Sequence, residues 1–137
     1  MRFVDTNVVL YAISRDPAEQ GKREVAETVL LSRDLALSTQ VLQEFYVQAT
    51  RLTRADRLRH ERAVGFVEAL LRFPVQGITK KIVLGAFATS ERFRISYWDA
   101  AILEASRALG CAVVLSEDLD DETDFDGVRV VNPFRVG

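Results

Sequence analysis

Short apolar runs alternate with longer amphipathic stretches along this chain. The short runs, at residues 2–5, 35–38, 74–76, 112–116 and 128–131, are typical of β-strands. Strands that alternate with helices favour a parallel sheet covered on both faces, with right-handed crossovers between neighbouring strands. The pattern therefore predicts an α/β fold, and it leaves the order of the strands open.

The amphipathic stretches predict the helices of this fold. Pro17 suits the first turn of one helix, and Thr53 to Asp56 resembles a capping box that would begin another. Either Ser38 or Thr39 would cap the helix over residues 39–51. Ser96 is a typical cap at the start of the last helix, and Gly110 is a typical residue just after its end. The expected helices cover residues 8–13, 17–33, 39–51, 53–72, 80–92 and 96–110.

Composition narrows the class of protein only slightly. A chain of 137 residues, 48% of them hydrophobic, is expected to form a single domain over residues 1–137. A net charge of −2 argues against binding nucleic acid by bulk charge alone, although residues 51–62 form a basic stretch. Cys111 is the only cysteine, and no signal-peptide or membrane-spanning pattern is present. We therefore expect a reduced, cytoplasmic protein that does not contact a membrane.

Two acids follow predicted strands directly. Asp5, in the triplet Asp5-Thr6-Asn7, ends the first run, and Asp118 lies just past the run 112–116. Ligands of open α/β sheets bind at the carboxyl ends of strands, so both carboxylates are expected at one rim. Each acid taken alone is equally well explained as a helix cap or as part of a solvated loop.

Two further acids lie on predicted helices beside apolar stripes. Glu44 is about 60° from Val41 on a helical wheel, and Asp99 lies about 40° from Leu103. A carboxylate turned toward a core needs a partner, either a metal ion or an arginine. Four converging carboxylates without a basic partner would suit Mg²⁺ or Mn²⁺ rather than zinc.

Other chemistries find less support in the sequence. His60 is the only histidine and lies in the basic stretch, which disfavours a Ser-His-Asp triad. No glycine-rich phosphate loop follows a strand, which disfavours nucleotide-binding and flavodoxin-like sites. A phosphatase of the haloacid dehalogenase type also begins with a strand and an Asp. Its mechanism, however, requires a second acid at the position where this chain has Asn7.

Five segments together resemble PIN domains over essentially the whole chain. They are residues 4–7 (VDTN), 41–46 (VLQEFY), 97–102 (YWDAAI), 115–119 (LSEDL) and 131–134 (VNPF). The compact length resembles the VapC-type toxins of bacterial toxin–antitoxin pairs. The resemblance implies a three-layer α/β/α sandwich and an endoribonuclease that depends on Mg²⁺ or Mn²⁺. It also implies an RNA substrate such as tRNA or rRNA, a cognate antitoxin that inhibits the protein, and a homodimer.

The resemblance also implies roles for particular residues. Its acidic positions, which hold metal and serve catalysis, match Asp5, Glu44, Asp99 and Asp118, and its supporting polar positions match Asn7 and Ser116. A further acid of the family falls on either Asp120 or Asp121. Within the basic stretch, Arg51, Arg54 and Arg57 are candidates for contacts to the RNA backbone. A module of the same fold that binds a partner or RNA without catalysis remains the alternative.

Three aromatic residues adjoin these motifs. Tyr46, Tyr97 and Trp98 could stack on bases, but general burial trends favour partly buried packing for all three.

Overall fold

The computed structural model describes residues 1–135. These residues form one sheet of six strands in the order β3-β2-β1-β4-β6-β5. All neighbouring strands run parallel except β5 and β6, which form an antiparallel pair. The strands are β1 (Arg2–Val4), β2 (Leu35–Ser38), β3 (Val75–Gln76), β4 (Val113–Leu115), β5 (Asp124–Phe125) and β6 (Val128–Val131).

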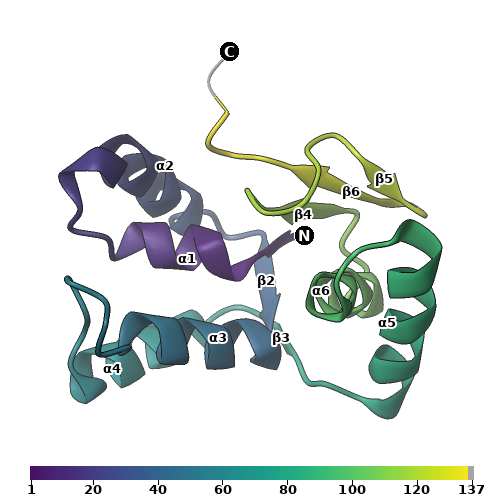
Figure 1. Cartoon of the computed structure of the whole chain (residues 1–137), viewed down its shortest axis with the longest axis horizontal. Helices are drawn as coiled ribbons and strands as arrows, with labels where there is room; N and C mark the ends of the chain where they lie inside the picture. Colours follow the sequence, from purple (N-terminus) through teal and green to yellow (C-terminus); the bar gives the residue numbers. More distant parts are fainter. Residues whose placement is uncertain (136–137) are drawn as a thin grey trace.

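Helices cover both faces of the sheet, which confirms the three-layer α/β/α sandwich. Figure 1 shows α1 to α4 on one side of the strands, and α5 and α6 on the other side. The helices are α1 (Thr6–Ala12), α2 (Gln20–Leu30), α3 (Thr39–Ala49), α4 (His60–Leu70), α5 (Lys80–Phe93) and α6 (Tyr97–Ala108), with a 3₁₀ turn η1 (Pro17–Glu19) before α2. Within residues 1–135, none of these helices is long and apolar enough to span a bilayer.

The distribution of helices follows from the handedness of the crossovers. From β1 the chain moves outward to β2 and then to β3, so both right-handed crossovers place their helices on the same face. After β3 the chain returns across the sheet to β4, which lies on the other side of β1. The same handedness then places α5 and α6 on the opposite face. The order reverses between β1 and β4, and such a reversal opens a crevice at the carboxyl ends of the two strands.

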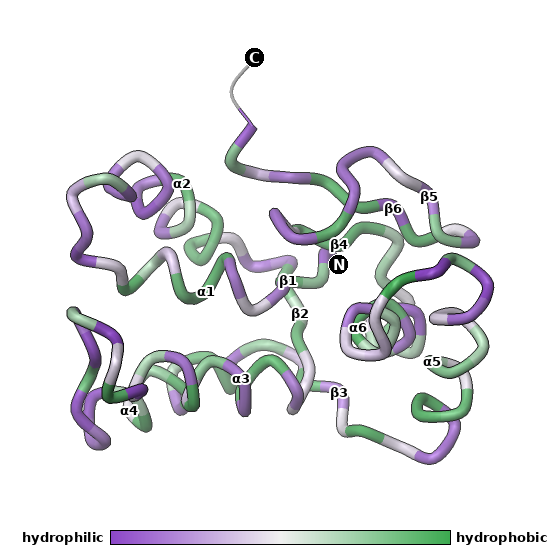
Figure 2. The backbone as a smooth tube through the Cα atoms, in the orientation of Figure 1, coloured by the Kyte–Doolittle hydropathy of each residue, from purple (hydrophilic) through white to green (hydrophobic). Residues whose placement is uncertain are grey.

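The core lies between the central strands and the inner sides of the helices. Strand β2 is buried along its whole length, as a parallel strand covered on both faces must be. Phe3 and Phe45 are the largest side chains that are fully buried. Figure 2 shows the hydrophobic colour along the central strands, whereas hydrophilic residues gather in the turn between α5 and α6. Cys111 is buried, and burial raises its pKa.

Helix ends agree with several predicted caps. The hydroxyls of Ser38 and Ser96 accept hydrogen bonds from backbone N–H groups at the starts of α3 and α6. Gly110 follows α6 with φ of 76°, the left-handed conformation that glycine adopts without strain. The segment expected as one helix over residues 17–33 instead begins with the turn η1 and ends at Leu30.

The expected capping box at residues 53–56 is wrong. Helix α4 begins only at His60, and residues 51–59 form a loop. The Asp56 carboxylate does not cap a helix, because it accepts hydrogen bonds from the backbone N–H of Arg15 and from the side chain of Arg54. The backbone N–H of Leu58 bonds to the carbonyl of Ala49, which returns the loop to the end of α3.

Strand β5 was not predicted from the sequence. It pairs antiparallel with β6 across a tight turn at Asp126 and Gly127, whose φ angles are 54° and 91°. Two consecutive residues with positive φ are typical of the hairpin turns that favour Asp-Gly. The surrounding residues 117–126 are strongly acidic, a composition that does not favour a strand.

Candidate active site

The candidate site lies where the strand order reverses. Asp5 directly follows β1, and Ser116 directly follows β4, the neighbouring strand. The Asp5 N–H donates to the carbonyl of Leu115 at 3.0 Å, and the Ser116 N–H donates to the carbonyl of Val131 at 3.1 Å. Both residues therefore continue the hydrogen-bond ladders of their strands, and the sheet fixes their separation.

Asp5 is held more tightly than the other acids of the site. Its side chain is 5% exposed. Its Oδ1 accepts from the backbone N–H of Thr6 at 2.7 Å, and its Oδ2 accepts from the hydroxyl of Ser116 at 2.7 Å. These contacts fix the orientation of the carboxylate without supplying a positive charge.

Asn7 connects the ends of the two strands. Its Nδ2 lies 3.3 Å from Asp5 Oδ2, 3.2 Å from Ser116 Oγ and 3.2 Å from Asp118 Oδ2. Its Oδ1 accepts from the backbone N–H of Glu117 at 3.1 Å. The Asp118 N–H donates to Ser116 Oγ at 3.1 Å. The structure thus brings Asp5, Asn7, Ser116 and Asp118 into one network, although Asp118 itself is exposed.

Glu44 reaches the same network from α3. Its Oε2 accepts from the hydroxyl of Thr6 at 2.8 Å, and its Oε1 accepts from Gln40 Nε2 at 2.8 Å. Gln40 also donates to the carbonyl of Trp98 at 3.2 Å, which joins α3 to the start of α6. Sequence reasoning assigned no role to the buried residues Thr6 and Gln40. A signal existed for Gln40, because it precedes Glu44 by four residues and such positions are neighbours on a helix.

Asp99 comes to the site from the opposite layer of the sandwich. It lies in the first turn of α6, where its N–H donates to the Ser96 hydroxyl at 3.1 Å. Its side chain is half-buried. The neighbouring Trp98 is 64% exposed, which corrects the expectation that it is packed, whereas Tyr46 and Tyr97 are partly buried as expected.

The four acids act on one another electrostatically. Burial raises the pKa of Asp5 to about 6, against hydrogen bonds from Ser116 and Thr6 that lower it, and the charges of Asp118 and Glu44 raise it further. Burial also raises the pKa of Asp99, and the same two charges add to this effect. Among residues 1–135, no lysine or arginine forms an ion pair with any of the four.

The donor chemistry of these four side chains suits a hard divalent cation. Carboxylate oxygens are the preferred ligands of Mg²⁺ and Mn²⁺, and the network contains no histidine or thiolate. In the described part of the chain, however, no three acidic, histidine or cysteine side chains are grouped closely enough to hold a metal ion as they stand. Mutual repulsion between uncompensated carboxylates is a physical reason for this spacing.

The two acids that compete with Asp118 lie in different surroundings. Asp121 accepts from the backbone N–H of Asn132 at 2.7 Å and pairs with Arg135 at 2.6 Å, so it anchors the segment after β6. Asp120 is exposed. Of the three acids, only Asp118 contacts Asn7 within residues 1–135.

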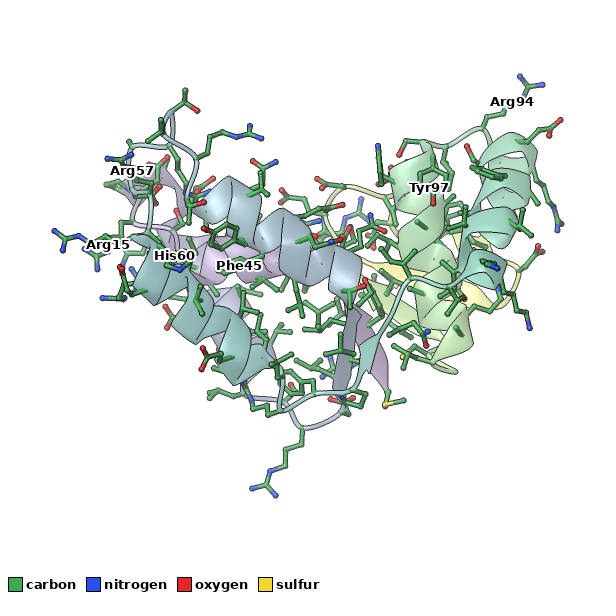
Figure 3. The ribbon with its side chains drawn as sticks, turned by 90° about the horizontal axis from the view of Figure 1, so that it is seen from below. Arg15, Phe45, Arg57, His60, Arg94 and Tyr97 are labelled. Atoms are coloured by element: carbon green, nitrogen blue, oxygen red, sulfur yellow. The ribbon has the colours of Figure 1, made fainter. Side chains whose placement is uncertain are left out.

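The three arginines considered for RNA contacts lie on the loop between α3 and α4. Arg51 and Arg57 are exposed, whereas Arg54 is half-buried and pairs with Asp56. Figure 3 shows Arg57 near Arg15 and His60 at one end of the molecule, with Tyr97 and Arg94 near the other end. The structure thus places the basic loop beside the α1–α2 turn, which carries Arg15.

These features define an α/β/α sandwich with an acidic site at the strand-order reversal. A sequence model described as the PIN domain matches residues 2–127, so the chain belongs to the PIN domain family. Membership of this family argues against the two other protein classes considered from the sequence, a phosphatase of the haloacid dehalogenase type and a flavodoxin-like binding domain. A comparison with curated proteins returns no match.

Solved structures with the same fold include proteins of toxin–antitoxin systems. A toxin–antitoxin complex from Klebsiella pneumoniae matches with a TM-score of 0.72 and 21% identity, over 99% of this chain and 100% of that one. FitAcB from Neisseria gonorrhoeae matches with a TM-score of 0.69 and 20% identity, over 99% and 100%. VapC20 of Mycobacterium tuberculosis, a toxin that cleaves the sarcin-ricin loop, matches with a TM-score of 0.68 and 20% identity, over 86% and 92%.

Proposed function

We propose that this protein is a metal-dependent endoribonuclease, the VapC-type toxin of a toxin–antitoxin pair, and that a cognate antitoxin inhibits it. The observation that carries the proposal is that Asp5, Glu44, Asp99 and Asp118 lie close enough for their charges to act on one another. Within residues 1–135 none of the four forms an ion pair with a lysine or arginine. Such a set is costly for the folded protein unless a cation binds there, and costly arrangements of this kind are typical of functional sites. The similar structures of toxin–antitoxin proteins support the partner.

In this proposal the four carboxylates would hold Mg²⁺ or Mn²⁺. When bound, such an ion makes a water molecule more acidic at neutral pH and stabilises negative charge on a phosphodiester. Asp5 would be the most rigidly held ligand, because Thr6 and Ser116 orient both of its oxygens. Asn7 holds Asp118 beside it, while Thr6 and Gln40 set the position of Glu44.

The protein offers two kinds of surface to RNA, an exposed aromatic ring next to Asp99 and a basic loop toward one end of the molecule. The exposed indole of Trp98 lies directly before Asp99, and an exposed aromatic ring stacks on unpaired bases of any sequence. The arginine-bearing loop 51–59 supplies positive charge for the phosphate backbone. A single strand or an RNA loop is therefore the substrate that these surfaces suit best.

Asp5→Asn and Asp99→Asn test the reaction class. Each substitution removes a negative charge from the crevice at nearly constant shape, so each should lower RNA cleavage in Mg²⁺ or Mn²⁺ by at least about a hundredfold. The measurement is sequencing of cleavage sites in cellular RNA after induction of the wild type or of either variant. Asp16→Asn, at an exposed acid that caps η1, is the matched control and should cleave normally. Full activity of both site variants would contradict the proposal.

A further inference from the structure

Arg54 lies in a small pocket beside the acidic crevice. The pocket has a volume of about 200 Å³ and is lined by Asn7, Leu10, Tyr11, Glu19 and Arg54. Asn7 is the residue whose amide contacts Asp5, Ser116 and Asp118. The pocket therefore shares a wall with the candidate site, and its volume is several times the roughly 30 Å³ that a water molecule occupies.

The Arg54 side chain is held in a defined orientation. Its Nε donates to Asp56 Oδ1 at 2.8 Å, and Asp56 Oδ2 in turn accepts from the backbone N–H of Arg15 at 2.7 Å. The two paired side chains are only 22% and 18% exposed. Neither terminal nitrogen of Arg54 donates to another group within residues 1–135, so this edge of the guanidinium is available to a ligand.

Two neighbouring arginines differ from Arg54 in this respect. Arg51 and Arg57 are exposed, and neither lines the pocket that contains Asn7. A mobile surface arginine contributes mainly long-range attraction, because ordering it costs side-chain entropy. An arginine already fixed by a carboxylate loses less entropy on binding and presents its remaining donors in a planar fork that matches a phosphate.

We propose that Arg54 binds a non-bridging phosphate oxygen of RNA in this pocket, next to the phosphodiester that the acidic site cleaves, and that Asp56 is the positioning residue for it. The proposal rests on the proposed nuclease function of this protein. Arg54 would thus differ from the other arginines of the basic loop, because it would align the RNA with the acidic site.

Glu19 allows a second test of phosphate binding in this pocket. It lines the same pocket, and its Oε1 accepts from the Ser14 hydroxyl at 2.6 Å. A carboxylate in the pocket opposes a phosphate, so the pocket attracts anions less than an arginine alone would. Glu19→Gln retains an oxygen for Ser14 and removes the charge. If a phosphate enters the pocket, this substitution tightens RNA binding by about two- to fivefold, the effect of one like charge near a protein surface.

The direct test measures binding of a short single-stranded RNA to variants made in the Asp99→Asn background, so that the RNA is not cleaved. Arg54→Ala should weaken Kd about tenfold to a hundredfold, as expected for lost charge-assisted hydrogen bonds, and lower the salt slope by about 0.7. Arg54→Lys keeps the charge but loses the fork, and it should recover only part of the affinity. Arg33→Ala removes the same charge from an exposed residue before β2, at the opposite end of the strands, and should change Kd little.

A chemical cycle identifies the contact. An RNA with one neutral methylphosphonate beside the mapped cleavage site lacks the charge that Arg54 would bind. Compared with unmodified RNA, the methylphosphonate RNA should bind much more weakly to the protein with Arg54 but only slightly more weakly to Arg54→Ala. The reason is that both changes remove the same interaction. Asp56→Asn should weaken binding when Arg54 is present and have no further effect when Arg54 is Ala, which a purely structural role of Asp56 would not produce.

The outcomes separate this inference from the proposed function. If the wild type cleaves RNA and Arg54→Ala binds like Arg33→Ala, the Arg54 proposal is wrong and the nuclease proposal stands. Additive penalties of the methylphosphonate and Arg54→Ala would also overturn it, as would a Glu19→Gln protein that binds no better than its parent. If the wild type cleaves no RNA in either metal, the proposed function itself fails.

Discussion

Asp5 is the residue on which the electrostatics of the site depend most. It is buried, oriented on both oxygens by neutral donors, and surrounded by other acids. Neutral donors lower its pKa less than burial raises it, so the pKa remains near 6. The folded protein without metal therefore binds a proton at Asp5 more readily than the unfolded chain does, and this difference makes its stability depend on pH.

The sign of this dependence gives a prediction for Asp5→Asn. The folded-state pKa of about 6 lies above the ordinary value of 3.8, so the free energy of unfolding should fall as the pH rises from about 4 to 6. Two pKa units correspond to roughly 3 kcal/mol, and Asn removes this titration at the cost of imperfect hydrogen bonds. Without metal, Asp5→Asn should therefore be about 1 to 3 kcal/mol more stable than the wild type at pH 7.5, by urea denaturation.

Asp34 provides a control of opposite sign. It is exposed and pairs with Arg2 through two hydrogen bonds of 2.8 Å, and this pairing lowers its pKa. The pairing stabilises the fold only where Asp34 is ionised, so Asp34→Asn should lose stability at neutral pH and approach the wild type on acidification. The advantage of Asp5→Asn should also disappear near pH 4. An advantage that persists unchanged across this range would contradict the electrostatic account of Asp5.

Among the helices and strands, the start of α6 combines a structural role, the helix cap, with a candidate functional role, the placement of Asp99. Ser96 caps the helix by accepting from the N–H of Asp99, and the same turn presents the Asp99 carboxylate to the crevice. The Ser96 side chain also hydrogen-bonds the carboxyl group of Asp99, and this contact lowers the pKa of Asp99 against the effect of burial. The cap therefore affects both the stability of α6 and the charge of a candidate ligand.

Ser96→Ala should reveal both tasks. Loss of an N-terminal cap typically costs about 1 kcal/mol of stability. Because the pKa of Asp99 then rises further, a given cleavage rate should require a higher Mn²⁺ concentration, most clearly below pH 7. Thr79→Ala is the matched control, since the Thr79 hydroxyl caps α5 by accepting from the N–H of Ile82. It should lose similar stability and keep its Mn²⁺ dependence, and an equal change in that dependence would contradict the role of Ser96.

For the molecule as a whole, the sandwich brings together acids that are far apart in the sequence. Asp5 and Asp118 come from neighbouring strands, Glu44 from the helical layer on one face and Asp99 from the layer on the other. A cation that bridges these layers would stabilise the complete fold, because the unfolded chain has no such site. The response of the whole domain to metal is thus a measure of the site.

Metal binding is predicted to raise the melting temperature. At a Mn²⁺ concentration one hundred times Kd, binding adds about 2.7 kcal/mol, or roughly 10 °C for a domain of this size. Differential scanning fluorimetry with MnCl₂ and MgCl₂ measures this shift, with CaCl₂ at the same ionic strength for comparison. Asp5→Asn should shift much less, whereas Asp34→Asn should shift like the wild type. Equal shifts in all three proteins would place the bound metal elsewhere.

The sequence by itself determined the class of fold and most of its elements. Strand 35–38 and the strand over 128–131 match the structure residue for residue. The first is buried along its whole length, whereas in the second the exposed Arg129 stands between buried valines, as alternation predicts for a strand with one solvated face. The cap Ser96 was also predictable, and Ser38 was one of two candidates with Thr39, since a cap is a local interaction. Asp5 and Asp118 were recognisable as residues at strand ends, because each lies just after an apolar run. The roles of the four acids remain predictions.

The tertiary structure alone decided what depends on contacts between distant segments. Asp56 was predicted to belong to a local capping box at residues 53–56, but its carboxylate accepts from the backbone N–H of Arg15 in a distant segment, and α4 begins only at His60. Thr6 and Gln40 acquired roles only when α1, α3 and α6 met. Strand order had the same origin, because a right-handed crossover is allowed to move in either direction along a sheet. Only the return of the chain after β3 created the reversal of strand order beside which Asp5 and Asp118 lie.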